Sequence, residues 1–107
     1  MKFEEAQKRA VEIQSKYRKI NQADGHKEWT SSDYMSGFVK DVGNLSKLIM
    51  IKNGLRNYDG DIERDLRHEI GDCFWSLLVL CKELNISPEE AIETTLNDLE
   101  ERLKDEV

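Results

Sequence analysis

Apolar residues recur at steps of three and four along most of this chain, and a single proline interrupts its 107 residues. This spacing gathers apolar side chains on one face of an α-helix, whereas a half-buried strand would alternate apolar and polar residues. The pattern is clearest near the start, in a seam formed by Phe3, Ala6, Ala10, Ile13, Tyr17 and Ile20. We therefore predict an all-α fold.

Capping residues divide the chain into four main helices, which we predict over about residues 2–20, 31–54, 61–84 and 87–103. Ser31 or Ser32 can cap the second helix, and Gly54 can stop it. The fourth helix has the clearest start, because Ser87 suits the cap and Pro88 suits the first helical position.

The whole chain, residues 1–107, is short enough to form one domain. Apolar residues make up 38% of it and charged residues 36%, which leaves little material for a core. We therefore expect a four-helix bundle that is completed by dimerisation, as a homodimer or a dimer of dimers.

Charge and hydropathy exclude several classes of protein. The formal net charge is -6 and the pI is near 4.9, whereas a duplex nucleic-acid binder needs a basic face. No apolar run approaches the roughly 20 residues of a membrane span, and the N-terminus lacks a signal-peptide core. Cys73 and Cys81 lie eight positions apart, too far along one helix to form a disulfide. The expectation is a cytoplasmic protein with reduced thiols.

Polar residues interrupt the apolar faces of the two middle helices. Asp41 and Asn44 are three positions apart on one helix, and Glu69 and Asp72 have the same spacing on the next. Residues three apart share a helix face, so an antiparallel pair would gather these four as oxygen ligands. Oxygen ligands suit Mg²⁺, or Mn²⁺, rather than zinc. The alternative from spacing alone is an exposed acidic face without a metal.

Three segments resemble one enzyme family. Residues 38–45 read Phe-Val-Lys-Asp-Val-Gly-Asn-Leu, residues 68–72 read His-Glu-Ile-Gly-Asp, and residues 84–91 read Leu-Asn-Ile-Ser-Pro-Glu-Glu-Ala. Together they resemble the MazG-like all-α nucleoside triphosphate pyrophosphohydrolases over about residues 35–103. That family carries Glu-Glu-x-x-Glu on one helix and Glu-x-x-Asp on the next, and the two motifs jointly bind Mg²⁺.

The resemblance implies that Asp41, Asn44, Glu69 and Asp72 bind the metal. Glu69 and Asp72 match the family's second motif. In the first motif, Lys40 and Asp41 stand where the family has two glutamates, and Asn44 stands at the third. An amide can coordinate Mg²⁺ through its oxygen, but it brings no charge and cannot act as a general base. Lys40 could contact a phosphate, or its charge could oppose metal binding.

The activity implied is hydrolysis of a ribo- or deoxyribonucleoside triphosphate to the monophosphate and pyrophosphate, in house-cleaning or control of nucleotide pools. Glu69 is the expected catalytic base. The expected phosphate contacts are Lys40, Lys47, Lys52 and Arg56. The alternatives are a catalytically weakened nucleotide-binding or helical dimerisation protein of the same fold, and an unrelated helical interaction domain.

Some residues allow more than one interpretation of their role. Trp29 lies where family members often build part of the base pocket, so it would bind the base or else pack over the bundle end. Trp75 is expected in the core or in a subunit interface. Gly43 and Gly71 stand between the paired polar positions, and a close approach of the two helices would explain glycine there.

Overall fold

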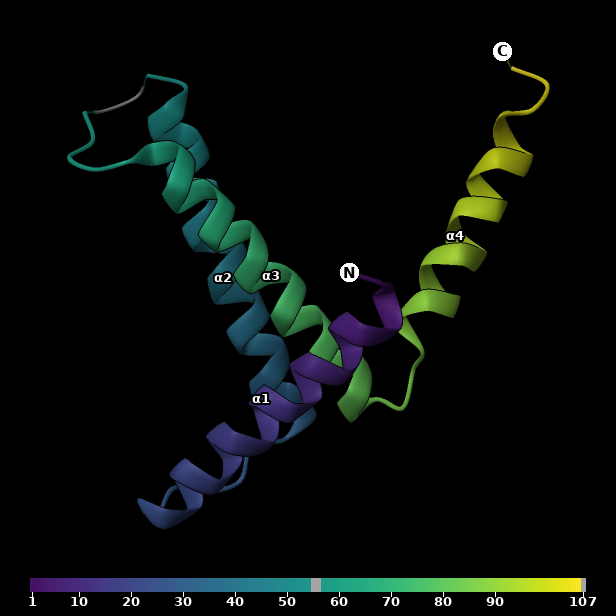
Figure 1. Cartoon of the computed structure of the whole chain (residues 1–107). Helices are drawn as coiled ribbons and strands as arrows, with labels where there is room; N and C mark the ends of the chain where they lie inside the picture. The colour runs from purple at the N-terminus through teal and green to yellow at the C-terminus, as the bar shows by residue number, and fades with distance from the viewer. Residues whose placement is uncertain (55–56, 107) are drawn as a thin grey trace.

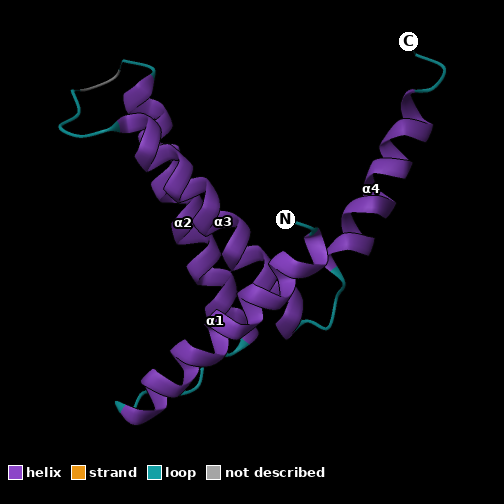
Figure 2. Ribbon diagram, in the orientation of Figure 1, coloured by secondary structure: helices purple, strands orange, loops and turns teal. Residues whose placement is uncertain are grey.

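The computed structural model describes residues 1–54 and 57–106, and within these ranges the chain is helical and contains no strand (Figures 1 and 2). The four helices are α1 (Phe3–Ala23), α2 (Ser31–Lys52), α3 (Ile62–Glu83) and α4 (Pro88–Leu103). The predicted all-α class and its four helices are confirmed, while dimerisation stays a prediction. No helix within the described ranges is both long enough and apolar enough to cross a bilayer.

The helix ends follow local capping chemistry. Ser87 accepts a hydrogen bond from the Glu90 N–H, and Pro88 occupies the start of α4, as predicted. At α2 the predicted cap is wrong, because Thr30 rather than Ser31 or Ser32 fills that position. The Thr30 hydroxyl accepts from the Asp33 N–H, and the Asp33 carboxylate accepts from the Thr30 N–H. This reciprocal pair, a capping box, is open only to a residue three positions before the acid.

Helices α2 and α3 pack side by side in opposite directions, and α1 crosses one end of this pair (Figure 1). The main helix contacts are between α2 and α3 and between α1 and α3. The buried apolar side chains lie on these three helices and are Ala10, Leu48, Ile51, Val79 and Leu80. Cys73 and Cys81 are both free thiols on α3.

A polar contact fixes where α1 crosses α3. Gln14 is only 5% exposed, and its side-chain amide donates to Glu83 Oε1. The same carboxylate oxygen accepts from Arg18 Nη2 at 3.1 Å. Burying an amide is costly unless it is hydrogen-bonded, so the crossing depends on Glu83 at the end of α3.

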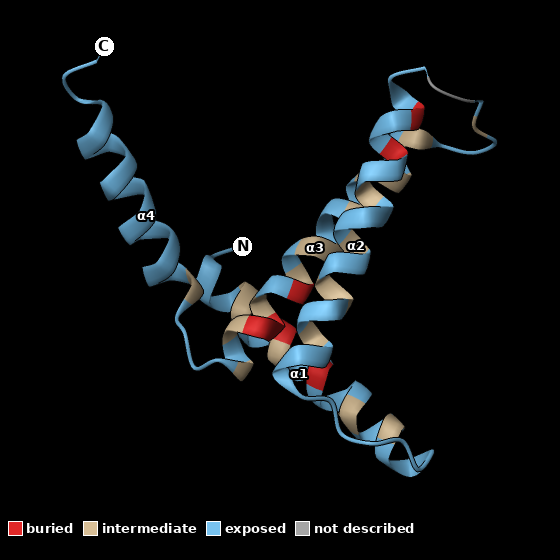
Figure 3. Cartoon of the chain, turned by 180° about the vertical axis from the view of Figure 1, so that it is seen from behind, coloured by how far each residue is buried: buried red, intermediate tan, exposed pale blue. Residues whose placement is uncertain are grey.

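Helix α4 stands away from the other three helices (Figure 3). Asn85 has a positive φ of 56°, which ends α3 in a left-handed residue. The Ile86 N–H then donates to the Cys81 carbonyl at 2.9 Å, and the Asn85 N–H to the Lys82 carbonyl at 3.2 Å. These two bonds form a Schellman cap, which sets the direction in which the chain leaves α3. Helix α4 buries none of its own residues.

The chain is expanded for its length. Its radius of gyration is 17.1 Å, whereas a compact domain of this length has about 13 Å. Its accessible surface is 8591 Å², against roughly 6,200 Å² for a folded monomer of this mass. The excess, about 2,400 Å², includes large apolar side chains on every helix.

Candidate functional site

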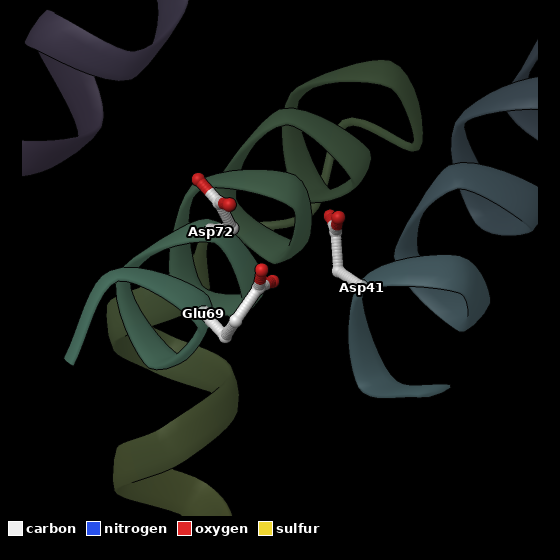
Figure 4. Close-up of side chains that lie close together, drawn as sticks. All are labelled: Asp41, Glu69 and Asp72. Carbon is white, nitrogen blue, oxygen red and sulfur yellow. The ribbon is translucent and has the colours of Figure 1, made fainter. Parts of the chain in front are cut away.

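Three carboxylates from two helices meet between α2 and α3. Asp41 comes from α2, and Glu69 and Asp72 come from successive turns of α3 (Figure 4). One carboxylate oxygen from each residue lies within 4.8 Å of the other two, and all three side chains are half-buried. The antiparallel packing of the helices produces this acidic cluster, as the spacing of the residues predicts.

The acidic cluster has the chemistry of a divalent cation site. Glu69 Oε2 is buried and finds no hydrogen-bond partner among the described residues. Asp41 accepts a hydrogen bond from the Ser76 hydroxyl, and His68 Nε2 lies 3.3 Å from Asp72 Oδ2. Across residues 1–54 and 57–106, no lysine or arginine forms an ion pair with any of the three carboxylates. Like charges that are half-buried together repel, and a hard cation offsets that repulsion.

The thiol of Cys73, beside the acidic cluster, is affected by the negative charge of the cluster. Burial raises the pKa of the Cys73 thiol, and the charges of Asp41, Glu69 and Asp72 raise it further. Cys81, two turns along α3, has a raised pKa from burial alone.

A cavity of about 750 Å³ adjoins the cluster. Asp41, Asn44 and Asp72 line it, together with residues of α1 and of the segment before α2. Two aromatic pairs contribute to its walls. Tyr17 and Trp75 meet edge to face with ring centres 6.0 Å apart, and Trp29 and Tyr34 do so at 5.3 Å. The cavity therefore combines flat apolar surfaces with the carboxylates of the cluster.

One hydrogen-bond donor of this aromatic cavity is free. The Trp75 indole N–H is buried and has no acceptor among the residues that the structure describes. A buried donor without a partner is costly. Trp29 packs over α2, where its ring would lie 3.5 Å from a Cβ added at Gly37.

A second cavity, of about 420 Å³, lies on the other side of the cluster. Glu69 and Asn44 line it together with Lys47, His68 and Tyr58. Asn44 lines both cavities, whereas Glu69 lines the second and Asp72 the first. The carboxylates thus stand between an aromatic cavity and a smaller polar one.

The structure separates the predicted phosphate contacts. Lys40 lines the aromatic cavity and Lys47 the polar one, so both lie beside the cluster. Lys52 instead forms an ion pair with Glu63 near the far end of the α2–α3 pair, and it lines neither cavity. Arg56 lies outside the described residues. Trp29 lines the aromatic cavity, and its role as a base contact stays a prediction.

Several contributors to the site were not predicted, including Tyr17 and Tyr34 in the cavity wall. Ser76, which binds Asp41, stands four residues after Asp72 inside an apolar run, and a lone hydroxyl in such a run was the available signal. Trp75 lines the cavity, although the sequence suggested a core or interface residue. The expected close approach at Gly43 and Gly71 is wrong, because a Cβ added at either residue would meet no heavy atom within 4 Å.

No protein-family model, curated protein or solved structure matches this chain. The MazG-like resemblance therefore depends on the motifs at residues 38–45, 68–72 and 84–91 alone.

Proposed function

We propose that this protein is a Mg²⁺-dependent nucleoside triphosphate pyrophosphohydrolase, with Mn²⁺ as a possible substitute for Mg²⁺. The substrate is a ribo- or deoxyribonucleoside triphosphate, and the products are the monophosphate and pyrophosphate. One observation carries the proposal: three carboxylates converge beside a cavity with aromatic walls. The MazG-like motifs supply the reaction class.

Asp41, Glu69 and Asp72 would hold the metal, and the Asn44 side-chain oxygen would add a neutral ligand. The donor set is oxygen only, which is the preference of Mg²⁺ and Mn²⁺. When bound there, the cation supplies charge neutralisation and orientation for the triphosphate. The buried, unpartnered Oε2 of Glu69 supports this assignment, because an isolated carboxylate oxygen lacks the compensation that burial requires.

The aromatic cavity would bind the nucleoside. Its volume of about 750 Å³ lies within the usual range of small-molecule sites. Trp29 and Tyr17 offer flat faces for a base. Lys40 lines the same cavity and would contact a phosphate.

Glu69 would act as the general base. It accepts a proton from a water molecule that attacks the α-phosphorus, while the bond from that phosphorus to the bridging oxygen breaks and pyrophosphate leaves with the electron pair. Glu69 faces the polar cavity, where Lys47 would contact the departing pyrophosphate. The nucleoside and the leaving group would thus occupy opposite sides of the cluster.

We further propose a homo-oligomer that works in the cytoplasm, in house-cleaning or control of nucleotide pools. The large accessible surface of the single chain supports association. Two free, half-buried cysteines fit a reducing compartment.

A second candidate function has its own supporting observation. Asn44 borders both cavities at a position where the family pattern has a carboxylate, and Lys40 brings a cation to the aromatic cavity. Both residues weaken the negative charge available to a metal. A nucleotide-binding or dimerisation protein with weak catalysis would tolerate these residues.

Pyrophosphate release tests the proposal. A panel of ribo- and deoxyribonucleoside triphosphates is incubated with the full chain in Mg²⁺ and in Mn²⁺. Glu69→Gln is expected to lose at least ~100-fold in rate, because it removes both the proposed base and a charged metal ligand at nearly constant shape. Glu63→Gln, a matched change on the same helix away from the cluster, should keep the rate. A folded chain that binds a nucleotide but releases no pyrophosphate would favour the second function.

A further inference from the structure

Helix α4 is a well-formed helix that has no extensive packing against the other three helices within residues 1–54 and 57–106. Its apolar stripe is Ile92, Leu96, Leu99 and Leu103, and these side chains are 43–54% exposed. The helix has 16 residues and buries none of them. Most of the stability of a helix in a protein comes from packing its apolar face, so α4 needs another surface to cover its stripe.

The connection to α3 directs α4 away from its own chain. Only four residues separate Glu83 from Pro88, and the Schellman cap at Asn85 and Ile86 fixes the backbone of two of them. Ser87 is fixed in turn as the cap of α4. In this conformation of the connection α4 stands away from the other three helices (Figure 3), and a second copy of the chain can supply the surface that covers its stripe.

The exposed seam of α1 has the matching spacing. Its residues, Phe3, Ala6, Ala10, Ile13, Tyr17 and Ile20, recur at alternating steps of three and four, as do those of the α4 stripe. Ala10 is buried against α3, whereas the four large side chains of the seam remain 41–56% exposed. Two helices with such heptad seams pack knobs into holes.

The charge pattern indicates that α4 packs on α1 and that the two helices run parallel. Lys2, Arg9 and Lys16 repeat at seven-residue steps along one edge of the α1 seam. Glu93 and Glu100 repeat in the same way along one edge of the α4 stripe. In heptad notation these are g and e positions, which face each other in a parallel pair of helices. Within the described part of the chain, none of these five residues forms an ion pair.

The alternative of α4 packing on α4 of another copy is disfavoured by charge. Residues 87–107 carry eight acidic and two basic side chains, whereas residues 1–20 carry six basic and three acidic ones. Two acidic segments would repel each other along their full length. A basic segment and an acidic one attract, which favours the α1 seam over a second α4.

The area available suits a stable dimer. The excess surface of about 2,400 Å² per chain corresponds to roughly 4,800 Å² for two chains, within the range of obligate dimers. We propose that two copies of this chain exchange their α4 helices, each α4 packing in parallel on α1 of the other copy. Ile13 and Tyr17 belong to this seam and also line the aromatic cavity, so the exchanged helix would border that cavity. The interface goes beyond the proposed reaction and does not depend on it.

Sedimentation equilibrium of the full chain provides the first test, with a dimer expected at micromolar concentration. Leu99→Glu places a charge in the stripe and is expected to give a monomer. Thr94→Glu adds the same charge on the opposite face of α4 and should remain a dimer. A wild-type chain that stays monomeric, or a Leu99→Glu chain that still dimerises, would overturn the proposal.

A charge exchange tests the pairing itself, without loss of apolar contacts. One preparation carries Arg9→Glu with Lys16→Glu, and the other carries Glu93→Lys with Glu100→Lys. Each alone should raise the dissociation constant on the order of 100-fold, because two charges on one side of each interface then meet charges of the same sign. Mixing the two restores both interfaces of a mixed dimer, so an equimolar heterodimer should form with nearly wild-type affinity. If no heterodimer forms on mixing, α4 does not pack on α1 of the other copy.

Discussion

The α2–α3 pair and α4 share one sequence feature, but they differ in how far their apolar faces are covered. Both regions show apolar stripes at helical spacing and hydroxyl or carboxylate caps at their starts. The pair buries part of its stripes, including Leu48, Ile51 and the fully buried Val79, whereas the whole stripe of α4 remains exposed. Periodicity and capping thus specify that a helix forms and which face is apolar. They do not specify which surface covers that face.

The largest expected effect is a difference in unfolding free energy between two leucine-to-alanine variants, one in each region. Leu48 is 9% exposed in the α2–α3 pair, and Leu48→Ala is expected to cost about 2–4 kcal/mol of unfolding free energy. Leu99→Ala, in the exposed stripe, should cost about 0.5 kcal/mol or less in a dilute, monomeric sample. Denaturant unfolding monitored by circular dichroism measures both. Equal costs under monomeric conditions would mean that α4 is packed within its own chain.

The same measurement at higher protein concentration sharpens the contrast. If α4 is exchanged between copies, the cost of Leu99→Ala rises with concentration, because the stripe becomes buried in the dimer. The cost of Leu48→Ala should rise little, since Leu48 is already buried in the single chain.

Binding of Mg²⁺ should stabilise the fold through the acidic cluster between α2 and α3, and not through α4. A metal present at 100 times its dissociation constant adds about 2.7 kcal/mol to the free energy of unfolding. Asp72→Asn is expected to lose this gain, while Asp98→Asn, the same change on α4, should keep it. Thermal unfolding with and without Mg²⁺ measures the difference. A similar gain in all three proteins would indicate general charge screening and would contradict a site at Asp41, Glu69 and Asp72.

The smallest expected effect is a pH dependence at the start of α3. The Tyr58 hydroxyl donates to Asp65, and this hydrogen bond lowers the pKa of Asp65 below its usual value. A carboxyl with a lowered folded pKa stabilises the fold above its unfolded pKa of about 3.9, and this contribution is lost as the pH falls through the folded pKa. Tyr58→Phe removes the donor, so its stability should fall less steeply with acid.

Unfolding of wild type, Tyr58→Phe and the control Tyr17→Phe between about pH 5 and pH 2 checks this. Tyr17 contacts Trp75 rather than an acid, so its variant should follow the wild-type slope. Parallel curves for wild type and Tyr58→Phe would show that the hydrogen bond does not contribute to stability.

The helices were predictable because their signals are local. Ser87, Pro88 and the apolar spacing define α4 without reference to the rest of the chain. The cap of α2 was misassigned by one position, since Thr30, Ser31 and Ser32 all carry hydroxyls. The position of Asp33 decides among them, because only Thr30 can form the reciprocal pair with it.

The candidate site was predictable only in part, for a related reason. Asp41, Glu69 and Asp72 meet because two helices pack antiparallel, and the spacing of the residues already implies a shared face. The role of Trp75 depends on where α1 crosses α3, which a buried contact between Gln14 and Glu83 determines. These two residues are 69 positions apart in the sequence, and no local pattern links them.

The four-residue turn after α3 also has a consequence for the order of events in assembly. Its hydrogen bonds close within one chain, on the sub-microsecond scale of local helix formation, whereas two chains meet at a rate set by diffusion and concentration. The conformation of this turn is therefore established before any encounter. In the proposed dimer, the partner would then meet a helix whose direction is already restricted, and part of the rotational search that slows the docking of a freely hinged segment would be avoided.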